Sequence, residues 1–150
     1  MKSNVKYAKL NKFFVVISTN AQIDIESFLS QFVDYKPNKI IISLDGFDQE
    51  SYQKYRIGGS FTKVIENLHK IRQWKIKHKS WFPLIEVQVL INRYNELYIN
   101  EFKHIAKTTN ATLKLKTMQI HDALGIKNFN PSNSKYSRYF KSGLSDHLSI

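Results

Sequence analysis

The feature that most constrains the fold of this chain is a regular alternation of short apolar runs with segments of helical periodicity. Between successive runs, apolar residues recur every three or four positions, which places them on one face of a helix. Alternating strands and helices favour right-handed βαβ units and a parallel sheet. We therefore predict the α/β class with about four parallel strands. The runs of strand length, rich in β-branched and aromatic residues, cover residues 13–17, 39–46, 84–91 and 111–120.

Capping residues set the expected helix boundaries. Asp24 is a suitable N-cap for a short helix over residues 25–33. Ser60 is a suitable N-cap for the longest periodic segment, whose apolar stripe runs from residue 61 to residue 74. A short helical stretch is expected around Tyr52 and Tyr55, before Gly58-Gly59. A fourth helix is expected over residues 97–106.

The chain loses its periodicity after the last expected strand. From residue 121 onward it gains Gly, Asn, Ser and Pro, which are the residues of turns and loops. A length of 150 residues fits one domain. We therefore expect residues 1–120 to form the domain and residues 121–150 to form a loop or an extended tail.

Composition excludes several classes of protein. A hydrophobic content of 42% with 13% aromatic residues is that of a folded chain. Cysteine is absent, which excludes disulfides, thiolate zinc sites, a cysteine nucleophile and a thiolate-held iron–sulfur cluster. The charge balance is 23 − 12 = +11, which suits a polyanion partner. The lysines are dispersed and no nucleic-acid-binding motif is present, so a nucleic-acid-binding module is only an alternative function.

The sequence offers no segment for a membrane. Its apolar runs fall short of the about 20 residues that cross a bilayer. Residues 1–6 lack the apolar region and the small-residue cleavage site of a secretory signal. We therefore expect a cytoplasmic protein without a membrane partner.

Polar side chains follow each expected strand. In α/β folds, ligands bind at the carboxyl ends of the strands, where the loops diverge and helix N-termini point. The same residue types also cap helices and shape turns, so both roles stay open for any single residue. The strand-end segments are Ser18-Thr19-Asn20, Ser43-Leu44-Asp45-Gly46, Asn92-Arg93 and residues 117–122.

Two expected strands carry polar residues on one face. Because side chains alternate along a strand, Glu86 and Gln88 share one face of the third strand, and Lys114 and Lys116 share one face of the fourth. In a barrel, these four side chains would line a polar lumen. At a sheet edge, the lysines would instead lie in water. Both interpretations remain open.

The histidines do not indicate a metal site. They are scattered, and no two have the spacing of metal ligands on a helix. His121-Asp122 beside the last strand is a weak acid/base candidate. We assign no catalytic residue and no metal ligand.

Several segments resemble, in the same order along the chain, the radical S-adenosylmethionine (radical SAM) enzymes, and in particular the subgroup with a C-terminal SPASM domain. The resemblance spans nearly the whole chain. Its most specific part is the combination of SLDG with YxxYRxGGSF. The segments are residues 17–21 (ISTNA), 42–46 (ISLDG), 51–61 (SYQKYRIGGSF), 64–68 (VIENL), 87–96 (VQVLINRYNE), 113–117 (LKLKT) and 135–139 (KYSRY).

The resemblance implies a partial (βα) barrel, and a 4Fe-4S cluster that cleaves S-adenosylmethionine reductively to a 5′-deoxyadenosyl radical. It implies that Ser43 contacts polar groups of S-adenosylmethionine, and that Arg56 pairs with its carboxylate, for which a guanidinium is well suited. Thr19, Asn20 and Asp45 match neighbouring motif positions. The full set of expected cofactor-binding residues is Ser43, Arg56, Asp45, Thr19, Asn20, Gln88 and Lys116.

The resemblance also indicates which parts of the family pattern are missing. The family's CxxxCxxC loop and GGE segment would precede residue 17, and the SPASM cysteines would follow residue 139. We therefore expect a truncated radical SAM core, an incomplete barrel whose residues 121–150 lead toward an absent SPASM domain. Without thiolates the chain is not expected to bind the 4Fe-4S cluster. Its affinity for S-adenosylmethionine would be weak or lost, and it would be inactive alone.

An incomplete barrel leaves its first strand unpaired on one side. We therefore expect the chain to self-associate through residues 13–18, or to be completed by a separately encoded N-terminal half. A neighbouring reading frame that holds CxxxCxxC and GGE would identify such a half.

Overall fold

The computed structural model describes residues 2–139 and contains one sheet of four parallel strands in the order β1-β2-β3-β4. β1 and β4 are the edges, so the sheet is open and does not close into a barrel. The predicted α/β class, with a partial parallel βα architecture, is confirmed. The strands are β1 (Val16–Thr19), β2 (Lys39–Ser43), β3 (Leu84–Ile91) and β4 (Thr112–Thr117).

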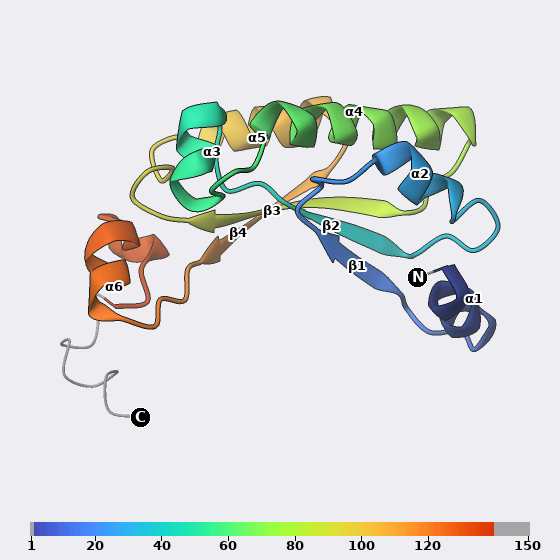
Figure 1. Cartoon of the computed structure of the whole chain (residues 1–150), viewed down its shortest axis with the longest axis horizontal. Coiled ribbons are helices and arrows are strands. Elements are labelled where there is room, and N and C mark those ends of the chain that lie inside the picture. Colours follow the sequence, from blue (N-terminus) through green and yellow to red (C-terminus); the bar gives the residue numbers. More distant parts are fainter. Residues whose placement is uncertain (1, 140–150) are drawn as a thin grey trace.

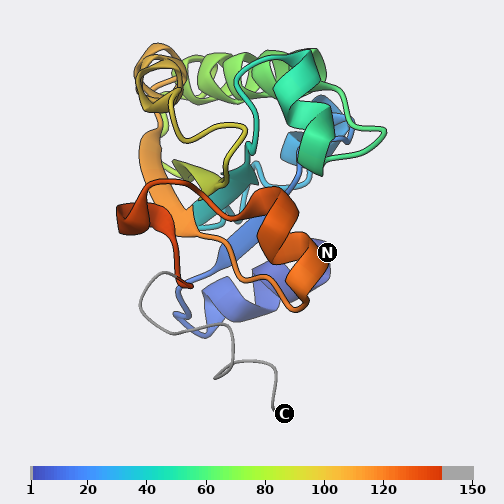
Figure 2. The same ribbon diagram turned by 90° about the vertical axis from the view of Figure 1, so that its left-hand side faces the viewer.

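The helices that connect the strands all cover the same face of the sheet (Figure 1). Two further helices, α1 (Lys2–Leu10) and α6 (Ala123–Phe129), lie on the other side, one at each end of the sheet (Figures 1 and 2). The sheet therefore has one covered face and one face that is open between α1 and α6. The covering helices are α2 (Ile25–Ser30), α3 (Gln49–Tyr55), α4 (Phe61–Lys77) and α5 (Ile99–Thr108).

The hydrophobic core lies between the sheet and the covering helices. Alternate residues of β2 and β3 point into it and are fully buried. Ser60 begins α4 as predicted, because its side chain accepts a hydrogen bond from the Lys63 amide at 3.2 Å. Burial of each large apolar side chain contributes about 1.5–3 kcal/mol. The central core residues are Ile40, Ile42, Val87 and Val89 of the sheet with Val64, Leu68 and Ile71 of α4.

β1 begins three residues later than predicted. Phe13 and Phe14 are 60% and 65% exposed and precede the strand. The amide of Val15 donates to the Asn38 side chain at 2.9 Å instead of to a neighbouring strand. The Val15 carbonyl still accepts from the Lys39 amide at 3.1 Å, so the Asn38 side chain takes the place of a ladder partner only at the Val15 amide. The aromatic residues give this segment strand propensity, but regular pairing begins at Val16.

The segment after β4 is also different from the prediction of a loop or tail. Residues 123–129 form α6, and Ser134–Tyr136 form a single 3-10 turn. Asp122 begins α6 by accepting from the Gly125 amide at 2.7 Å, so His121-Asp122 supplies a helix cap. Residues 140–150, part of the expected tail, lie outside the described residues.

α1 was not predicted from the sequence. Val5 is its buried contact with the core. Lys9 at its carboxyl end donates to the Asn38 side chain at 2.9 Å, the same oxygen that Val15 uses. Asn38 therefore fixes α1 beside the amino end of β1. No helix among residues 2–139 is both long and apolar enough to span a bilayer.

Candidate functional site: the open sheet face and the strand ends

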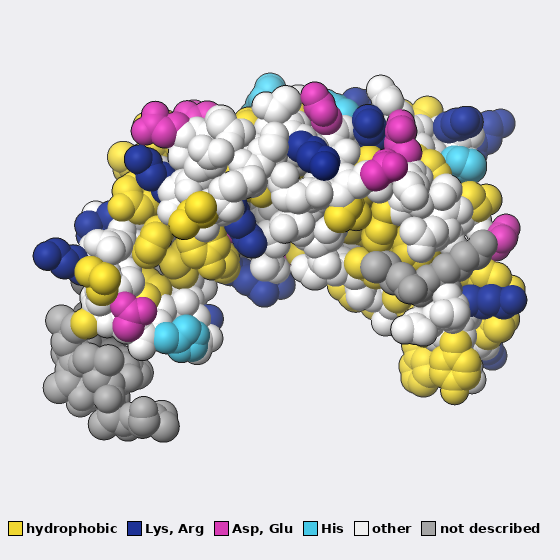
Figure 3. All heavy atoms as spheres, viewed as in Figure 1, with side chains coloured by type: hydrophobic (Ala, Val, Ile, Leu, Met, Phe, Trp, Pro, Cys, Tyr) yellow, Lys and Arg dark blue, Asp and Glu magenta, His cyan; other side chains and the backbone are white. Residues whose placement is uncertain are grey.

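The open face of the sheet carries a row of polar side chains. Ser43 of β2 is in register with Gln88 of β3, and Gln88 is in register with Lys114 of β4. Lys116 lies two residues further along, opposite Leu90. These residues alternate with the buried core residues, so their side chains point away from the helices. The underside of the molecule is hollowed between its two ends (Figure 3).

The sheet is open, so the β4 lysines do not line a closed lumen but lie at a sheet edge, as the second interpretation predicted. Lys114 and Lys116 are exposed and belong to an edge strand. They also point to the open face, on the same side as Gln88. Glu86 on that face is paired with Lys39 at 2.6 Å and is 7% exposed, so its charge is already compensated. Lys114 and Lys116, both on β4, therefore give the open face its net positive charge.

At the carboxyl ends of the strands, Asp45 is the centre of a buried polar network. One oxygen of its carboxylate receives Arg56 Nε at 2.7 Å and Nη2 at 2.6 Å. The other oxygen accepts the Leu90 amide at 2.8 Å. Asn95 donates to the backbone oxygens of Asp45 and Leu90 at 2.9 and 3.0 Å. The network therefore joins the ends of β2 and β3 to the loop that follows each of them.

Burial sets the acidity of Asp45. Its side chain is fully buried, and the resulting loss of hydration raises the pKa of the carboxyl above its ordinary value. The Leu90 amide and the Arg56 charge act in the opposite direction but only in part. Asp45 therefore accepts hydrogen bonds that join parts of the fold. The Leu90 amide and Arg56 both stabilise its charged form.

Arg56 lines a cavity of about 520 Å³ next to this network. Asn20 and Gln22, from the loop after β1, line the same cavity, together with Tyr52 of α3. Gln22 donates to the Tyr52 hydroxyl at 3.2 Å and to the Ser60 carbonyl at 2.9 Å. The structure thus brings together two residues expected from the sequence, Asn20 and Arg56, and adds Gln22 and Tyr52, which the sequence analysis did not single out.

The wall of this cavity depends on a close approach between Gly46 and α3. A Cβ atom at Gly46 would lie 2.2 Å from the backbone nitrogen of Tyr52. No side chain can be accommodated there without moving α3. The tyrosine is fully buried, which raises the pKa of its hydroxyl above the ordinary value. Gly46 therefore allows the loop after β2 to pack directly against α3.

The remaining expected site residues have local roles. Thr19 accepts from the Ala21 amide at 3.0 Å, and Asn20 accepts from the Gln22 amide at 3.1 Å, so both shape the turn after β1. Thr19 is in register with the buried Ile42 and so lies on the covered side of the sheet. It does not join the row formed by Ser43 and Gln88.

The donor set of this chain does not fit a 4Fe-4S cluster. The sequence has no cysteine, and such clusters are held by thiolates. Within residues 2–139, no three His, Asp or Glu side chains come together as a metal site. No reaction step that needs a cluster can therefore be assigned to residues of this chain.

No protein-family model matches the chain, and no curated protein matches it. The resemblance to radical SAM enzymes accordingly depends on the quoted motifs alone.

Proposed function

We propose that this chain is a half-barrel of the radical SAM type that binds S-adenosylmethionine weakly at its strand ends and acts only when a partner completes the barrel. The observation that carries the proposal is the one-sided sheet. All four strands are parallel and the connecting helices cover one face, while the other face is polar, as the inner face of a ligand-holding barrel is.

Three side chains are the proposed contacts for the ligand. Arg56 uses Nε and Nη2 on Asp45, whereas its Nη1 atom has no hydrogen-bond partner among the described residues. That nitrogen can donate to the carboxylate of the methionine moiety, in the charge-assisted manner typical of arginine. Ser43 and Gln88 offer a hydroxyl and an amide to its other polar groups.

The partner has two proposed forms. One is a separately encoded half that holds the cluster, since this chain supplies no thiolate. The other is a second copy of this chain joined through β1, the edge strand. Open edges of this kind recruit further strands because their backbone groups are unpaired. The first form allows catalysis, whereas the second gives only binding.

Titration calorimetry with S-adenosylmethionine tests the binding part. Gln88→Leu removes the amide from the open face while keeping the size of the side chain, and should weaken binding roughly tenfold. Gln73→Leu on the outer surface of α4 is the matched control and should leave the heats unchanged. Equal heats for wild type and Gln88→Leu, or no heat for wild type at millimolar ligand, would exclude the open face as the binding site.

A further inference from the structure

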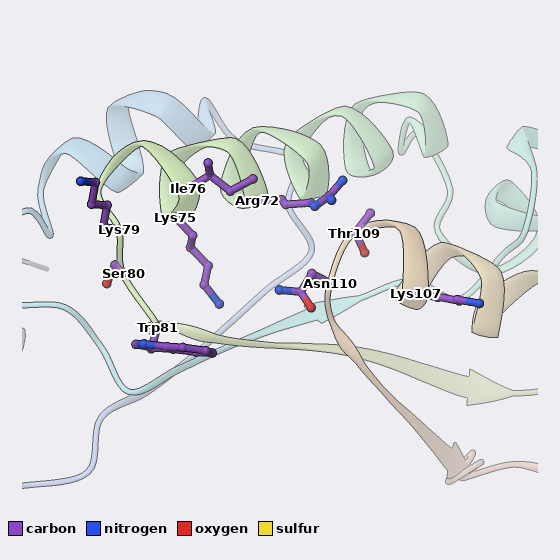
Figure 4. Close-up of a pocket in the computed structure, with 9 residues that line it drawn as sticks. All are labelled: Arg72, Lys75, Ile76, Lys79, Ser80, Trp81, Lys107, Thr109 and Asn110. Carbon is purple, nitrogen blue, oxygen red and sulfur yellow. The ribbon is translucent and has the colours of Figure 1, made fainter.

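A second cavity lies at the other end of the sheet, beside the amino ends of β3 and β4. Its volume is about 570 Å³, within the range of roughly 300–1,000 Å³ for small-molecule sites. Its walls are the last turns of α4, the loop that leads to β3 and the end of α5 (Figure 4). It is separate from the strand-end site around Arg56, so its function does not depend on the proposed function above.

The lining of this cavity is strongly cationic. Arg72, Lys75, Lys79 and Lys107 line it, and no Asp or Glu does. None of these four cations forms an ion pair with another residue in the range 2–139. Arg72 alone is anchored, since it donates to the Thr108 carbonyl at 3.2 Å. An unneutralised group of cations around a concave surface attracts an anion of complementary size.

Lys75 and Trp81 are the two residues best placed for a ligand. Trp81 is 86% exposed, an unusual position for a large aromatic side chain. Lys75 is half-buried and extends from α4 toward the level of the indole ring, and Asn110 lines the same cavity (Figure 4). Loss of hydration lowers the pKa of Lys75, as expected for a cation without an acidic neighbour.

We propose that this cavity binds a nucleotide unit, with the base stacked on Trp81 and the phosphate held by Lys75 and the surrounding cations. An exposed aromatic ring offers a stacking surface to any base. The cations supply charge for a phosphate, and Asn110 supplies an amide for hydrogen bonding. The nucleotide unit can come from a free mononucleotide or from a single-stranded nucleic acid, because both present the same base and phosphate.

Tryptophan fluorescence measures this binding directly. The chain has two tryptophans, so the background variant Trp74→Phe leaves Trp81 as the only tryptophan. The probes are AMP, ribose 5-phosphate and a single-stranded oligothymidylate. We expect saturable quenching with AMP or the oligonucleotide, and binding of ribose 5-phosphate at least tenfold weaker, because it has no base to stack.

Two variants and one control locate the site. Lys75→Met should weaken binding of the nucleotide about tenfold, the effect of losing one charge-assisted hydrogen bond. Trp81→Ala, followed by calorimetry, should weaken it by a similar factor. Lys103→Met removes an exposed cation of α5 that does not line the cavity, and should change affinity less than twofold. Thermal melts verify that each variant is folded.

The possible results distinguish a free mononucleotide from a single-stranded nucleic acid, and they also show when the proposal is wrong. Binding of AMP that both variants weaken indicates a free nucleotide, whereas binding of the oligonucleotide alone, weakened by the same variants, indicates a single strand. Equal binding of AMP and ribose 5-phosphate would overturn base stacking. Absence of binding, or equal losses in Lys75→Met and Lys103→Met, would overturn the site.

Discussion

Arg56 holds a single carboxylate oxygen of Asp45 from two nitrogens, Nε at 2.7 Å and Nη2 at 2.6 Å, across eleven residues of sequence. The Asp45 side chain is fully buried, whereas the Arg56 side chain is 29% exposed to solvent. This pair joins α3 to the end of β2, and the Leu90 amide connects it to β3. The stability of the fold and the geometry of the proposed ligand site therefore depend on the same guanidinium.

Removal of Arg56 should destabilise the protein because it leaves a buried carboxylate without a countercharge. Breaking a buried pair from one side costs about 3–5 kcal/mol, and the partial exposure of Arg56 reduces the expected loss for Arg56→Ala to about 2–3 kcal/mol. Urea unfolding at pH 7 measures it. Lys54→Ala, which removes an exposed pair with Glu50, is the control. A similar small loss in both variants would show that water compensates Asp45.

The loss caused by Arg56→Ala should depend on pH in a defined direction. Burial already raises the pKa of Asp45 in the wild type, and removal of the positive charge should raise it further. A raised carboxyl pKa means that the folded state binds the proton more tightly, so the variant loses stability as the pH rises through that pKa. The difference in unfolding free energy between wild type and Arg56→Ala should therefore be smaller at pH 4 than at pH 7. A constant difference would contradict the shift.

Asp48 should stabilise α3 as an N-cap with the opposite pH dependence. Its carboxylate accepts the Ser51 amide at 2.8 Å within a capping box, which lowers the pKa of Asp48 below its ordinary value. Asp48→Ala should cost about 1 kcal/mol. This contribution is present above the ordinary carboxyl pKa and disappears as the pH falls through the lowered one. Asp48→Asn keeps a capping oxygen and should remove most of the pH dependence in urea unfolding experiments.

Two glycines near the proposed site should respond very differently to alanine. At Gly46 the added methyl group would meet the backbone of Tyr52, so Gly46→Ala should displace α3 and cost well over about 2 kcal/mol. At Gly58 no atom lies within 4 Å, and only the φ of +75° opposes the side chain, which costs about 1 kcal/mol. Thermal unfolding of both variants measures the contrast. Equal losses would mean that the loop and α3 adapt to each other.

The open β1 edge should cause concentration-dependent association. Val16 is 46% exposed on this edge strand, and a lysine there would make strand addition unfavourable. Sedimentation velocity of the wild type should therefore detect dimers that Val16→Lys abolishes. Thr62→Lys on the exposed side of α4 is the charge-matched control. A monomeric wild type with slow hydrogen exchange in β1 would show that the edge is already protected.

The sequence predicted the elements whose signals are local. β3 runs from Leu84 to Ile91 as predicted, because a run of eight residues, apolar except for Glu86 and Gln88, lies between Pro83 and the polar Asn92. Ser60 and Asp24 cap the helices for which they were proposed. In each case, residues within one turn or one strand determine the boundary.

Prediction from the sequence was wrong or incomplete where residues distant along the chain determine the structure. The start of β1 depends on the Asn38 side chain, which accepts the Val15 amide in place of a backbone carbonyl. α6 was missed because Gly125 and Asn128 inside it, and Asn130-Pro131 just after it, are residue types of turns, although Asp122 was an available N-cap signal. The cationic cavity was missed because it combines Lys75 with Trp81 and the end of α5, whereas along the sequence the lysines are dispersed. Gln22 and Asn95 gave no motif signal of their own.

The two edges of the sheet have different chemistry, and this difference has a consequence for assembly. β4 carries Lys114 and Lys116 with their ammonium groups exposed, which opposes the addition of another strand there. β1 carries no such charge. Two copies that meet through β1 would form a twofold, isologous contact in which each copy uses up its only receptive edge. Growth would therefore stop at the dimer, and the charged edge would protect the protein from polymerising into filaments.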